Sequence, residues 1–585
     1  MIRLSKILLF FALLCSLLSL PFFISQFEFA YYGHNITAGI IAVGAGVVLM
    51  KGGKIKMGYP APLVALVIYT AWTVWDRSSA VPVPFHYAWL LLPVGVLLLG
   101  GYIVLLSDGR LSVLSTGRMV VLLAASEGIV CLLQYLKWID PPGDLYQVCG
   151  TLANPNLTAM FIAMTIPLLF FIHQNDRSRF RFFIPVAFVF SGIALLLLQS
   201  RAAGIGAGIA GVHFFARKYH SERYIKVVFT SKWRLTGAII LLFAFLSVMI
   251  YGVYHFKKAS SDSRLLIWKI GIEMLAEKPV SGYGYYSFEQ RYNLAQAAYF
   301  ESGRGTEAER YNAAHVRIGY NDFFQNMMEG GITGFLLYLI FIGSLLYAGR
   351  SRLTSHEQRA AYSGILVFSS MSLFNTAELT VPVFSMLMLY TSVLCVGDNN
   401  RTYYTGKWMA ILLVLVALLM IFYQLKAATA SLHLKKAQEY AWAGQNEKAL
   451  DALQPYSKTL QYAENYWIVS GMASQKMKKY DLALDKYRKA LNLTSSPEVY
   501  IRQGECLMET GQYNEAIQSC STALNIAPSR LLPRYTLMKI HERQMDTVQV
   551  LRMAHELINQ TPKGNSKNAD FFKKEALKLI KSYKK

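Results

Sequence analysis

Long apolar runs recur along the chain from its first residues to about residue 425 and then stop. A window of about 19 residues separates thirteen runs, near residues 7–25, 35–50, 61–75, 87–107, 118–136, 156–172, 182–200, 202–216, 236–255, 333–349, 360–377, 380–397 and 407–424. A helix of about 20 apolar residues crosses a bilayer. Only 16% of the residues are charged, against roughly 25% in a soluble domain. The pattern therefore predicts an all-α, polytopic membrane protein with about 12 to 13 spans.

Lysine and arginine gather in every second connection between the apolar runs. The basic connections include residues 51–56, 110–118, 177–181 and 217–234. Because basic loops stay on the cytoplasmic side of a membrane, we expect a cytoplasmic N-terminus. We attribute the net charge of +23 mainly to the lysines and arginines of these connections. No basic stripe interleaved with aromatic residues lies on a soluble region, so the sequence does not predict nucleic acid as a partner.

One outer connection, residues 256–332, is far longer than the others. It contains about 77 residues and lies between two apolar runs. Loops of this length are uncommon in compact proteins unless they carry function. We therefore interpret residues 1–430 as a transmembrane domain whose chemistry lies in this large outer loop.

From about residue 431 the chain becomes helical and repetitive. The segments GQNEKAL, KKYDLAL and GQYNEAI align at Ala449, Ala483 and Ala516, which lie 34 and 33 residues apart. This is the period of tetratricopeptide repeats, which stack paired helices through small residues. The pattern predicts an α-solenoid over residues 431–562 on the outer face, followed by a basic C-terminal helix or tail at 563–585. The array either only packs against itself or binds a peptide or partner protein on its concave face.

Three polar features lie on the predicted outer side of the membrane. They are Arg201 between two spans, Arg264 and Trp268 one turn apart in the large loop, and the group His315, Arg317, Tyr320, Asn321 and Glu329 before and within the tenth span. Charged groups near membrane depth cost free energy, which makes each a functional candidate. A forked guanidinium suits bidentate binding of a diphosphate, although an interfacial arginine can also be a snorkelling anchor. The six cysteines have no metal-site spacing, so neither a zinc site nor a disulfide framework is expected.

Four motifs in order resemble the O-antigen ligase and O-antigen polymerase family of bacterial membrane glycosyltransferases. They are GTLANPN at 150–156, QSRAAGIGAG around Arg201, SRLLIW with KPVSGYGYYSF around Arg264, and YNDFFQNMMEGGITG from Tyr320. The resemblance implies transfer of a glycan from undecaprenyl diphosphate to an acceptor at the periplasmic face of the inner membrane. It also implies that Arg201 and Arg264 hold the diphosphate. Substrate-binding candidates are Asn154, Asn156, Trp268, Arg317, Asn321 and Glu329.

The last motif departs from the family at one position. The family places a histidine directly before the asparagine, but Tyr320 precedes Asn321 here and the nearest histidine is His315. Either His315 reaches the acceptor hydroxyl as a base, which typically contributes roughly 10²-fold to 10⁴-fold, or Tyr320 fills the position. Arginines can balance the charge on a departing diphosphate. The resemblance therefore implies no metal and no other cofactor.

The sequence does not identify the molecule that accepts the glycan. Lipid A core would make the protein an O-antigen ligase, another glycan chain would make it a polymerase, and a protein would make it a protein O-oligosaccharyltransferase. The repeats favour a protein partner, by analogy with other repeat arrays. From other classes, the chain could be a membrane-anchored scaffold or a transporter. A transporter should show inverted repeats with Gly- or Pro-broken spans, and the sequence shows none.

Overall fold

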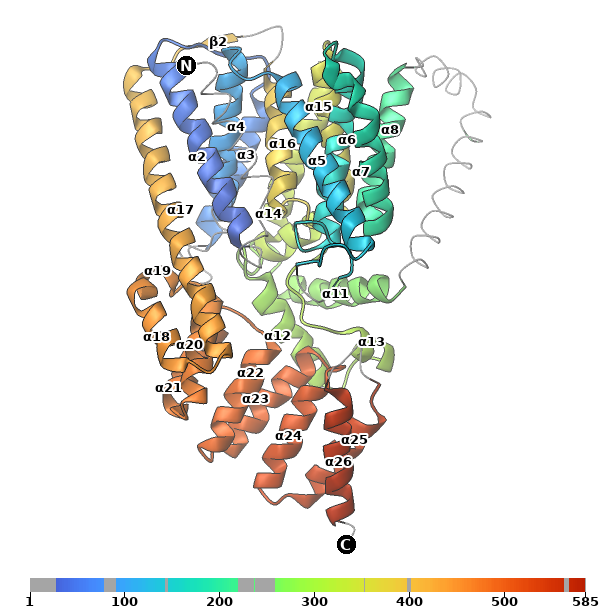
Figure 1. The fold of residues 1–585 in the computed structure, drawn as a ribbon, viewed down its shortest axis with the longest axis vertical. Coiled ribbons are helices and arrows are strands. Elements are labelled where there is room, and N and C mark those ends of the chain that lie inside the picture. The colour runs from blue at the N-terminus through green and yellow to red at the C-terminus, as the bar shows by residue number, and fades with distance from the viewer. Residues whose placement is uncertain are drawn as a thin grey trace.

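The computed structural model describes residues 28–77, 91–142, 146–218, 236, 258–351, 353–396, 401–561 and 568–583. Of the residues that the structure describes, 78% are helical and almost none are in strands, which confirms the predicted all-α class. Three parts follow one another along the long axis in Figure 1: a helical bundle, a small group of inserted helices, and a helical array that ends at the C-terminus.

The bundle contains the apolar helices. They are α2 (Glu28–Met50), α3 (Ala61–Arg77), α4 (Leu91–Ser107), α5 (Val113–Tyr135), α6 (Pro155–Asn175), α7 (Ile184–Leu198), α8 (Arg201–Lys218), α14 (Asp322–Ser351), α15 (His356–Ser372), α16 (Val381–Cys395) and the first part of α17 (Lys407–Trp442), with the 3-10 turn η2 (Arg179–Phe182) before α7. Eleven of the thirteen predicted spans coincide with these helices. The other two, near 7–25 and 236–255, lie outside the described residues except for residue 236.

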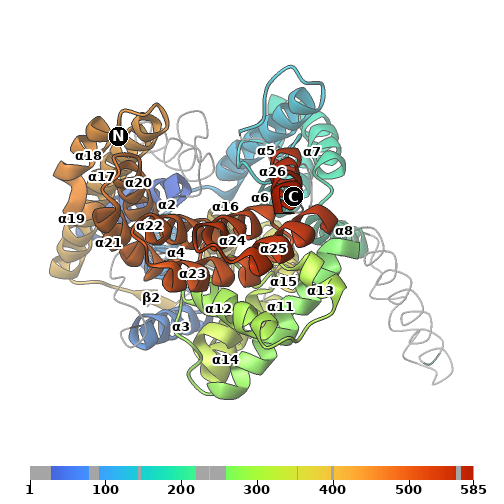
Figure 2. The same cartoon turned by 90° about the horizontal axis from the view of Figure 1, so that it is seen from below.

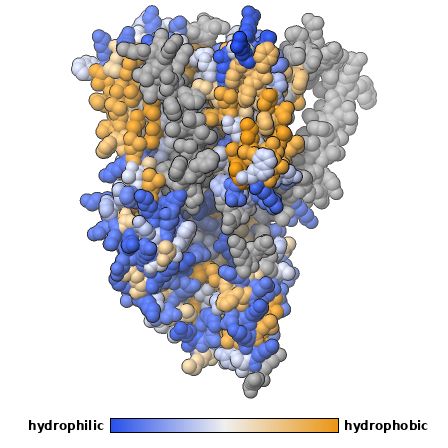
Figure 3. All heavy atoms as spheres, in the orientation of Figure 1, coloured by the Kyte–Doolittle hydropathy of each residue, from blue (hydrophilic) through white to orange (hydrophobic). Residues whose placement is uncertain are grey.

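The surface of the bundle is hydrophobic, whereas the helical array is hydrophilic. Figure 3 shows a broad apolar zone over the bundle and mainly polar residues over the array. By length and composition, five described helices can cross a membrane, and four shorter apolar helices accompany them. The protein is therefore a multi-pass membrane protein with several candidate spans.

Glycines let α2 approach α17 closely. A Cβ built on Gly39 would lie 2.5 Å from Cγ1 of Ile421, and one on Gly46 would lie 2.5 Å from Cγ2 of Val414. Small residues at such contacts allow helices to pack inside a membrane, where no hydrophobic effect drives them together. At the end of the bundle far from the array, strand β1 (Ile55–Met57) pairs antiparallel with β2 (Arg401–Tyr403).

The inserted helices occupy the space between the bundle and the array. They are α11 (Lys258–Glu277), α12 (Phe288–Glu301) and α13 (Glu307–Asn312). Figure 1 shows α11 across the end of the bundle and α12 between α14 and the array. Their own apolar core includes Leu266, Ile270, Tyr292 and Phe300. The predicted large loop is thus a packed helical unit, and α14 begins within it.

The array, which we call the repeat domain, continues from α17 without a break. Its further elements are α18 (Asn446–Leu453), η3 (Gln454–Tyr456), α19 (Ser457–Leu460), α20 (Glu464–Lys476), α21 (Tyr480–Leu491), α22 (Pro497–Glu509), α23 (Tyr513–Ile526), α24 (Leu531–Arg543), α25 (Thr547–Asn559) and α26 (Ala569–Tyr583). The repeat alanines Ala449, Ala483 and Ala516 are fully buried. Seen from below in Figure 2, the paired helices form an arc across the end of the bundle, as stacked repeats do.

Candidate functional site

Two arginines from distant segments share one region at the end of the bundle that faces the repeat domain. Arg201 is the first residue of α8, and its Nη1 donates to Oγ of Ser261 at 2.8 Å. Arg264 lies on α11, and its Nη1 donates to the carbonyl oxygen of Phe374 at 2.5 Å. Burial lowers the pKa of Arg264, and the nearby charge of Arg201 lowers it further. Two cations that repel each other in this way create a site suited to an anion.

Tyr320 completes this region, which we call the arginine site. Its ring lies 4.9 Å from Cζ of Arg264, as in a cation–π contact. The backbone of Tyr320 has a φ of +54°, a left-handed conformation that costs free energy for a bulky residue. Such strain persists only where the surroundings hold it, and it is commonest at functional positions.

The segment around Tyr320 is fixed by three polar contacts. Nε1 of Trp268 donates to the carbonyl oxygen of Gly319 at 3.2 Å. Asn321 caps α14, because its Oδ1 accepts from the backbone N–H of Phe324 at 3.0 Å. Nδ2 of Asn321 donates to the carbonyl oxygen of Leu373 at 3.0 Å. Trp268 and Asn321 therefore support the position of Tyr320.

The loop before α6 forms another edge of the arginine site. Glu127 of α5 accepts from the backbone N–H and the hydroxyl of Thr151, which holds this loop in place. Asn154 caps α6 and accepts from the backbone N–H of Asn156 at 2.9 Å. Tyr146, at the start of the loop, is close enough to Tyr320 to affect its titration. Asn154 is therefore the N-terminal cap of α6 at the end of this loop.

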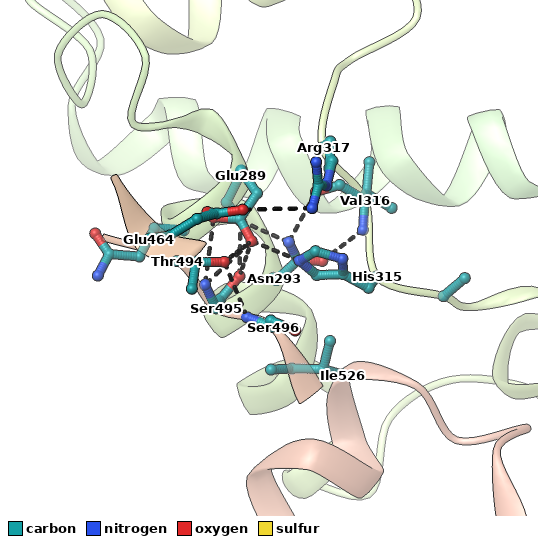
Figure 4. A network of polar contacts seen from close by, with 12 residues as sticks. Glu289, Asn293, His315, Val316, Arg317, Glu464, Thr494, Ser495, Ser496 and Ile526 are labelled. Atoms are coloured by element: carbon teal, nitrogen blue, oxygen red, sulfur yellow. Dashed lines mark hydrogen bonds and ion pairs between the residues drawn. The ribbon is translucent and has the colours of Figure 1, made fainter. Parts of the chain in front are cut away.

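His315 lies elsewhere, in a joint between the inserted helices and the repeat domain (Figure 4). Its Nε2 contacts Oε1 of Glu289 on α12 at 2.5 Å. The same Glu289 oxygen accepts from the hydroxyls of Thr494 and Ser495 at 3.0 and 2.9 Å. Arg317 reaches Glu464 of α20 at 3.4 Å in the same network. Arg317 therefore contacts the repeat domain directly, whereas His315 is linked to it through Glu289.

Further contacts extend this joint along α12. Nε2 of Gln290 donates to the carbonyl oxygen of Leu491 at 2.8 Å, and Nε2 of Gln296 donates to that of Ile526 at 2.7 Å. These carbonyl groups lie at the ends of α21 and α23. We call the contacts of Glu289, Gln290, Gln296 and their partners the repeat joint. It holds the repeat domain by the edges of successive repeats.

Glu329 lies in the protein interior on α14. Its Oε1 accepts from Nε2 of Gln325 at 2.9 Å and from the backbone N–H of Phe288 at 3.3 Å. The carboxylate thus anchors the turn that precedes α12. The ten predicted site residues therefore lie in four different places. Arg201, Arg264, Trp268, Tyr320 and Asn321 come together, Asn154 and Asn156 lie at the neighbouring helix start, His315 and Arg317 lie at the repeat joint, and Glu329 is internal.

Sequence reasoning missed a second polar group directly behind the arginine site. Asp322, Asn326 and Glu378 are buried there together with Tyr69. The only sequence signal was that acidic residues stand next to the ends of apolar runs. Within the described part of the chain, no group of three or more His, Cys, Asp or Glu side chains is arranged to hold a metal ion.

Comparisons with known proteins concern the same region. Residues 186–339 match the model of the O-antigen ligase family, and residues 497–530 match a tetratricopeptide repeat. A protein of Rickettsia conorii with the name "putative polysaccharide ligase" is 28% identical over 157 residues, which are 25% of this chain and 35% of that protein. The match thus spans about a third of the relative. Arg201, Arg264 and Tyr320 all lie inside the matched family segment.

Proposed function

Because the chain contains an O-antigen ligase domain at residues 186–339 and a C-terminal tetratricopeptide repeat, we propose that it is a glycan ligase of the bacterial inner membrane. It takes an oligosaccharide or polysaccharide from undecaprenyl diphosphate and joins it to an acceptor hydroxyl. The reaction occurs at the periplasmic face, and the N-terminus is cytoplasmic. This orientation follows the basic connections of the sequence.

The observation that carries the proposal is the convergence of Arg201 and Arg264 beside Tyr320. Among the described residues, no carboxylate forms an ion pair with Arg264, and its guanidinium donates to the backbone carbonyl oxygen of Phe374. A structural arginine near a membrane normally pairs with an acid or snorkels to water. Two adjacent guanidinium groups instead supply the positive charge and forked donors that a diphosphate requires.

The chemistry of the transfer follows from these groups. The acceptor oxygen attacks the anomeric carbon, the bond between that carbon and the diphosphate oxygen breaks, and the diphosphate leaves with the bonding electrons. Arg201 and Arg264 balance the negative charge that grows on the leaving group. The proton of the acceptor hydroxyl passes to water or to a diphosphate oxygen.

Tyr320 acts in this scheme as a hydrogen-bond donor. Burial raises the pKa of Tyr320, although the charge of Arg264 opposes the shift. The phenol therefore keeps its proton at neutral pH and can donate it in a hydrogen bond to the diphosphate or the sugar. His315, paired with Glu289 at the repeat joint, has a structural role.

The repeat domain supports a macromolecular acceptor. It lies across the end of the bundle that carries the arginine site, and it is fixed there through α12 (Figures 1 and 2). An acceptor protein bound by the repeats would be held near the site, which raises its effective concentration. A protein hydroxyl is thus the favoured acceptor, with lipid A core and a second glycan chain as the alternatives.

The test is transfer by the purified full-length protein in lipid vesicles. Labelled undecaprenyl-diphosphate glycan is supplied with periplasmic proteins, lipid A core or free glycan, and the product that gains label identifies the acceptor. Arg264→Ala should lower transfer by roughly 10²-fold to 10³-fold, the usual effect of removing one charge-stabilising donor. The matched control is Arg291→Ala on the exposed side of α12. Transfer by Arg264→Ala at the level of the control would refute the diphosphate site.

A further inference from the structure

Two carboxylates are buried together directly behind the arginine site. Only 1% of Asp322 and 6% of Glu378 is exposed. Asp322 is the first residue of α14, and Glu378 lies in the loop between α15 and α16. This loop also provides the carbonyl oxygens that bind Arg264 and Asn321, from Phe374 and Leu373. The buried acids therefore sit at the base of a loop that the arginine site depends on.

The orientation of the Asn326 amide is fixed by its donors. Nδ2 of Asn326 donates to the carbonyl oxygen of Asp322 at 2.9 Å and to Oε2 of Glu378 at 3.1 Å. Rotating the amide would place its oxygen against two other acceptors. Oδ1 of Asn326 must therefore face Tyr69, whose hydroxyl oxygen lies 2.5 Å away.

The hydroxyl group of Tyr69 has two hydrogen-bond acceptors as neighbours but only one proton to donate. The hydroxyl oxygen of Tyr69 lies 2.5 Å from Oδ1 of Asn326 and 2.9 Å from Oε1 of Glu378. A phenol has a single proton, and an amide oxygen and a carboxylate can only accept. Both contacts are satisfied only if Glu378 is protonated, so that it donates to Tyr69 while Tyr69 donates to Asn326.

Asp322 has the opposite environment. Its Oδ2 accepts from the backbone N–H groups of Ala377 and Glu378 at 3.0 and 3.1 Å. Two N–H donors on one oxygen stabilise an ionised carboxylate. With Asp322 ionised, a second charge in the same buried space would be strongly unfavourable. Burial raises the pKa of Glu378 to about 7, although the hydrogen bonds that Asn326 and Tyr69 can donate to the ionised form oppose the shift.

We propose that Glu378 is a neutral carboxylic acid in the working protein and that this proton positions the loop of residues 373–378 against the arginine site. Glu378 is a positioning residue, since it acts on the donor through the loop and through Arg264. The part of the proposal that concerns transfer rests on the function proposed above. The titratable groups that face Glu378 are Tyr69 of α3, Tyr285 of the turn before α12, and Asp322, Glu329 and Tyr338 of α14.

Loss of the proton has a defined consequence. An ionised Glu378 would face the carboxylates of Asp322 and Glu329 and would no longer donate to Tyr69. The two N–H bonds from residues 377 and 378 to Asp322 would then weaken, and the loop would release the carbonyl group that holds Arg264. Because the neutral fraction falls about tenfold per pH unit above the pKa, glycan transfer should fall in the same way above about pH 7.

The first experiment measures the proton and the loop without any transfer assay. Infrared spectra of the full-length protein in lipid should contain a carboxylic-acid C=O band of Glu378 that disappears as the pH rises through about 7. This band is identified as the difference between the wild type and Glu378→Gln, because the buried Glu329 lies nearby. Hydrogen exchange of residues 373–378, corrected for the intrinsic pH dependence of exchange, should rise over the same range in the wild type only. Glutamine is the right variant, because its amide can donate to Tyr69 and accept from Asn326 as the protonated acid does.

The matched control is Glu357→Gln, which removes a partly buried carboxylate at the other end of α15. It should keep both the infrared band and the rise in loop exchange. An unchanged band in Glu378→Gln, or equal loop exchange in Glu378→Gln and the wild type at high pH, would overturn the proposal.

The second experiment follows glycan transfer from pH 6 to 9. The wild type should lose about tenfold for each pH unit above about 7, whereas Glu378→Gln should stay nearly constant. Parallel pH profiles for the two proteins would overturn the positioning role. If no protein transfers glycan but the band and the loop exchange behave as expected, the proposed function fails and the assignment of the proton stands.

Discussion

Replacing Glu289 by alanine should release the repeat domain from the inserted helices. Four donors converge on this carboxylate: Nε2 of His315, the hydroxyl of Thr494, and the N–H and hydroxyl of Ser495. The side chains of Glu289 and His315 are only 18% and 13% exposed. Truncating a carboxylate that accepts several hydrogen bonds at a largely buried site should cost about 2–5 kcal/mol, because each donor left unpaired costs about 1–3 kcal/mol. The docked state should therefore become roughly 30-fold to several thousand-fold less favoured.

Hydrogen exchange measures this release at defined amides. In Glu289→Ala the peptide that contains Ser495 should exchange faster, together with the facing part of α12. The far end of the repeat domain, represented by α25 and α26, should keep its protection. The matched control is Glu301→Ala at the exposed end of the same helix. Equal protection of the Ser495 peptide in the wild type and in Glu289→Ala would refute the assignment of Glu289 as the centre of the joint.

Acid should weaken the same joint in the wild type. Burial by itself would raise the pKa of Glu289, but the hydrogen bonds and charge of His315 and the bonds from Ser495 hold it below its ordinary value of 4.5. A carboxylate with a depressed pKa stabilises the docked state above its ordinary pKa and loses that contribution as the pH falls through the lowered value. Exchange at Ser495 should thus rise below about pH 4.5, and Glu289→Ala should show no such rise.

Three further outcomes are expected. Tyr320→Phe should lower transfer at the arginine site roughly tenfold or more, because a hydrogen bond is lost. His315→Ala should instead increase hydrogen exchange at the repeat joint and leave single-turnover transfer to a small glycan acceptor near normal. The reverse ranking of the two variants in transfer would make His315 the base. Gly331→Ala should lower the melting temperature in detergent, because φ is +62° there and a Cβ would lie 2.2 Å from the carbonyl oxygen of Val280. The control Gly343→Ala should leave the melting temperature unchanged, because a Cβ there meets open space. A reporter fused at the C-terminus should be active only in the periplasm and one inserted after Arg110 only in the cytoplasm, and a cytoplasmic C-terminal signal would reverse the proposed orientation.

Local rules were enough to predict the elements of the fold. The spans follow from runs of apolar residues, because backbone groups in lipid must be paired within a helix. The repeats follow from alanines at a fixed period, because only small residues allow paired helices to approach. Ala483 and Ala516 are accordingly buried completely. The exact unit boundary was not predictable, since α17 passes from the bundle into the repeat domain as one helix.

The site could be predicted only in part, for a physical reason. Arg201 and Arg264 became candidates because each is a charged residue next to a span, and Tyr320 became one because it fills the family's histidine position. The role of His315 depends on Glu289, 26 residues away, and that of Glu289 depends on Ser495, 206 residues away. The proton on Glu378 depends on the distances to its neighbours. No local pattern encodes such contacts, because they arise only when the helices pack.

One short segment links the two functional regions of the protein. His315 is held by Glu289 at the repeat joint, and five residues later Tyr320 stacks on Arg264 at the arginine site. Between them Gly319 is held at both its carbonyl group and its N–H, by Trp268 and Gln325. A segment this short and this constrained cannot shift at one end without straining the other. The left-handed backbone of Tyr320 is the point where that strain would act. We therefore expect the docking of the repeat domain and the geometry of the arginine site to be coupled through this segment. Glu289→Ala should therefore also raise hydrogen exchange around Tyr320, and a cross-link that locks the joint should suppress that rise. Unchanged exchange around Tyr320 in Glu289→Ala would show that the two regions are independent.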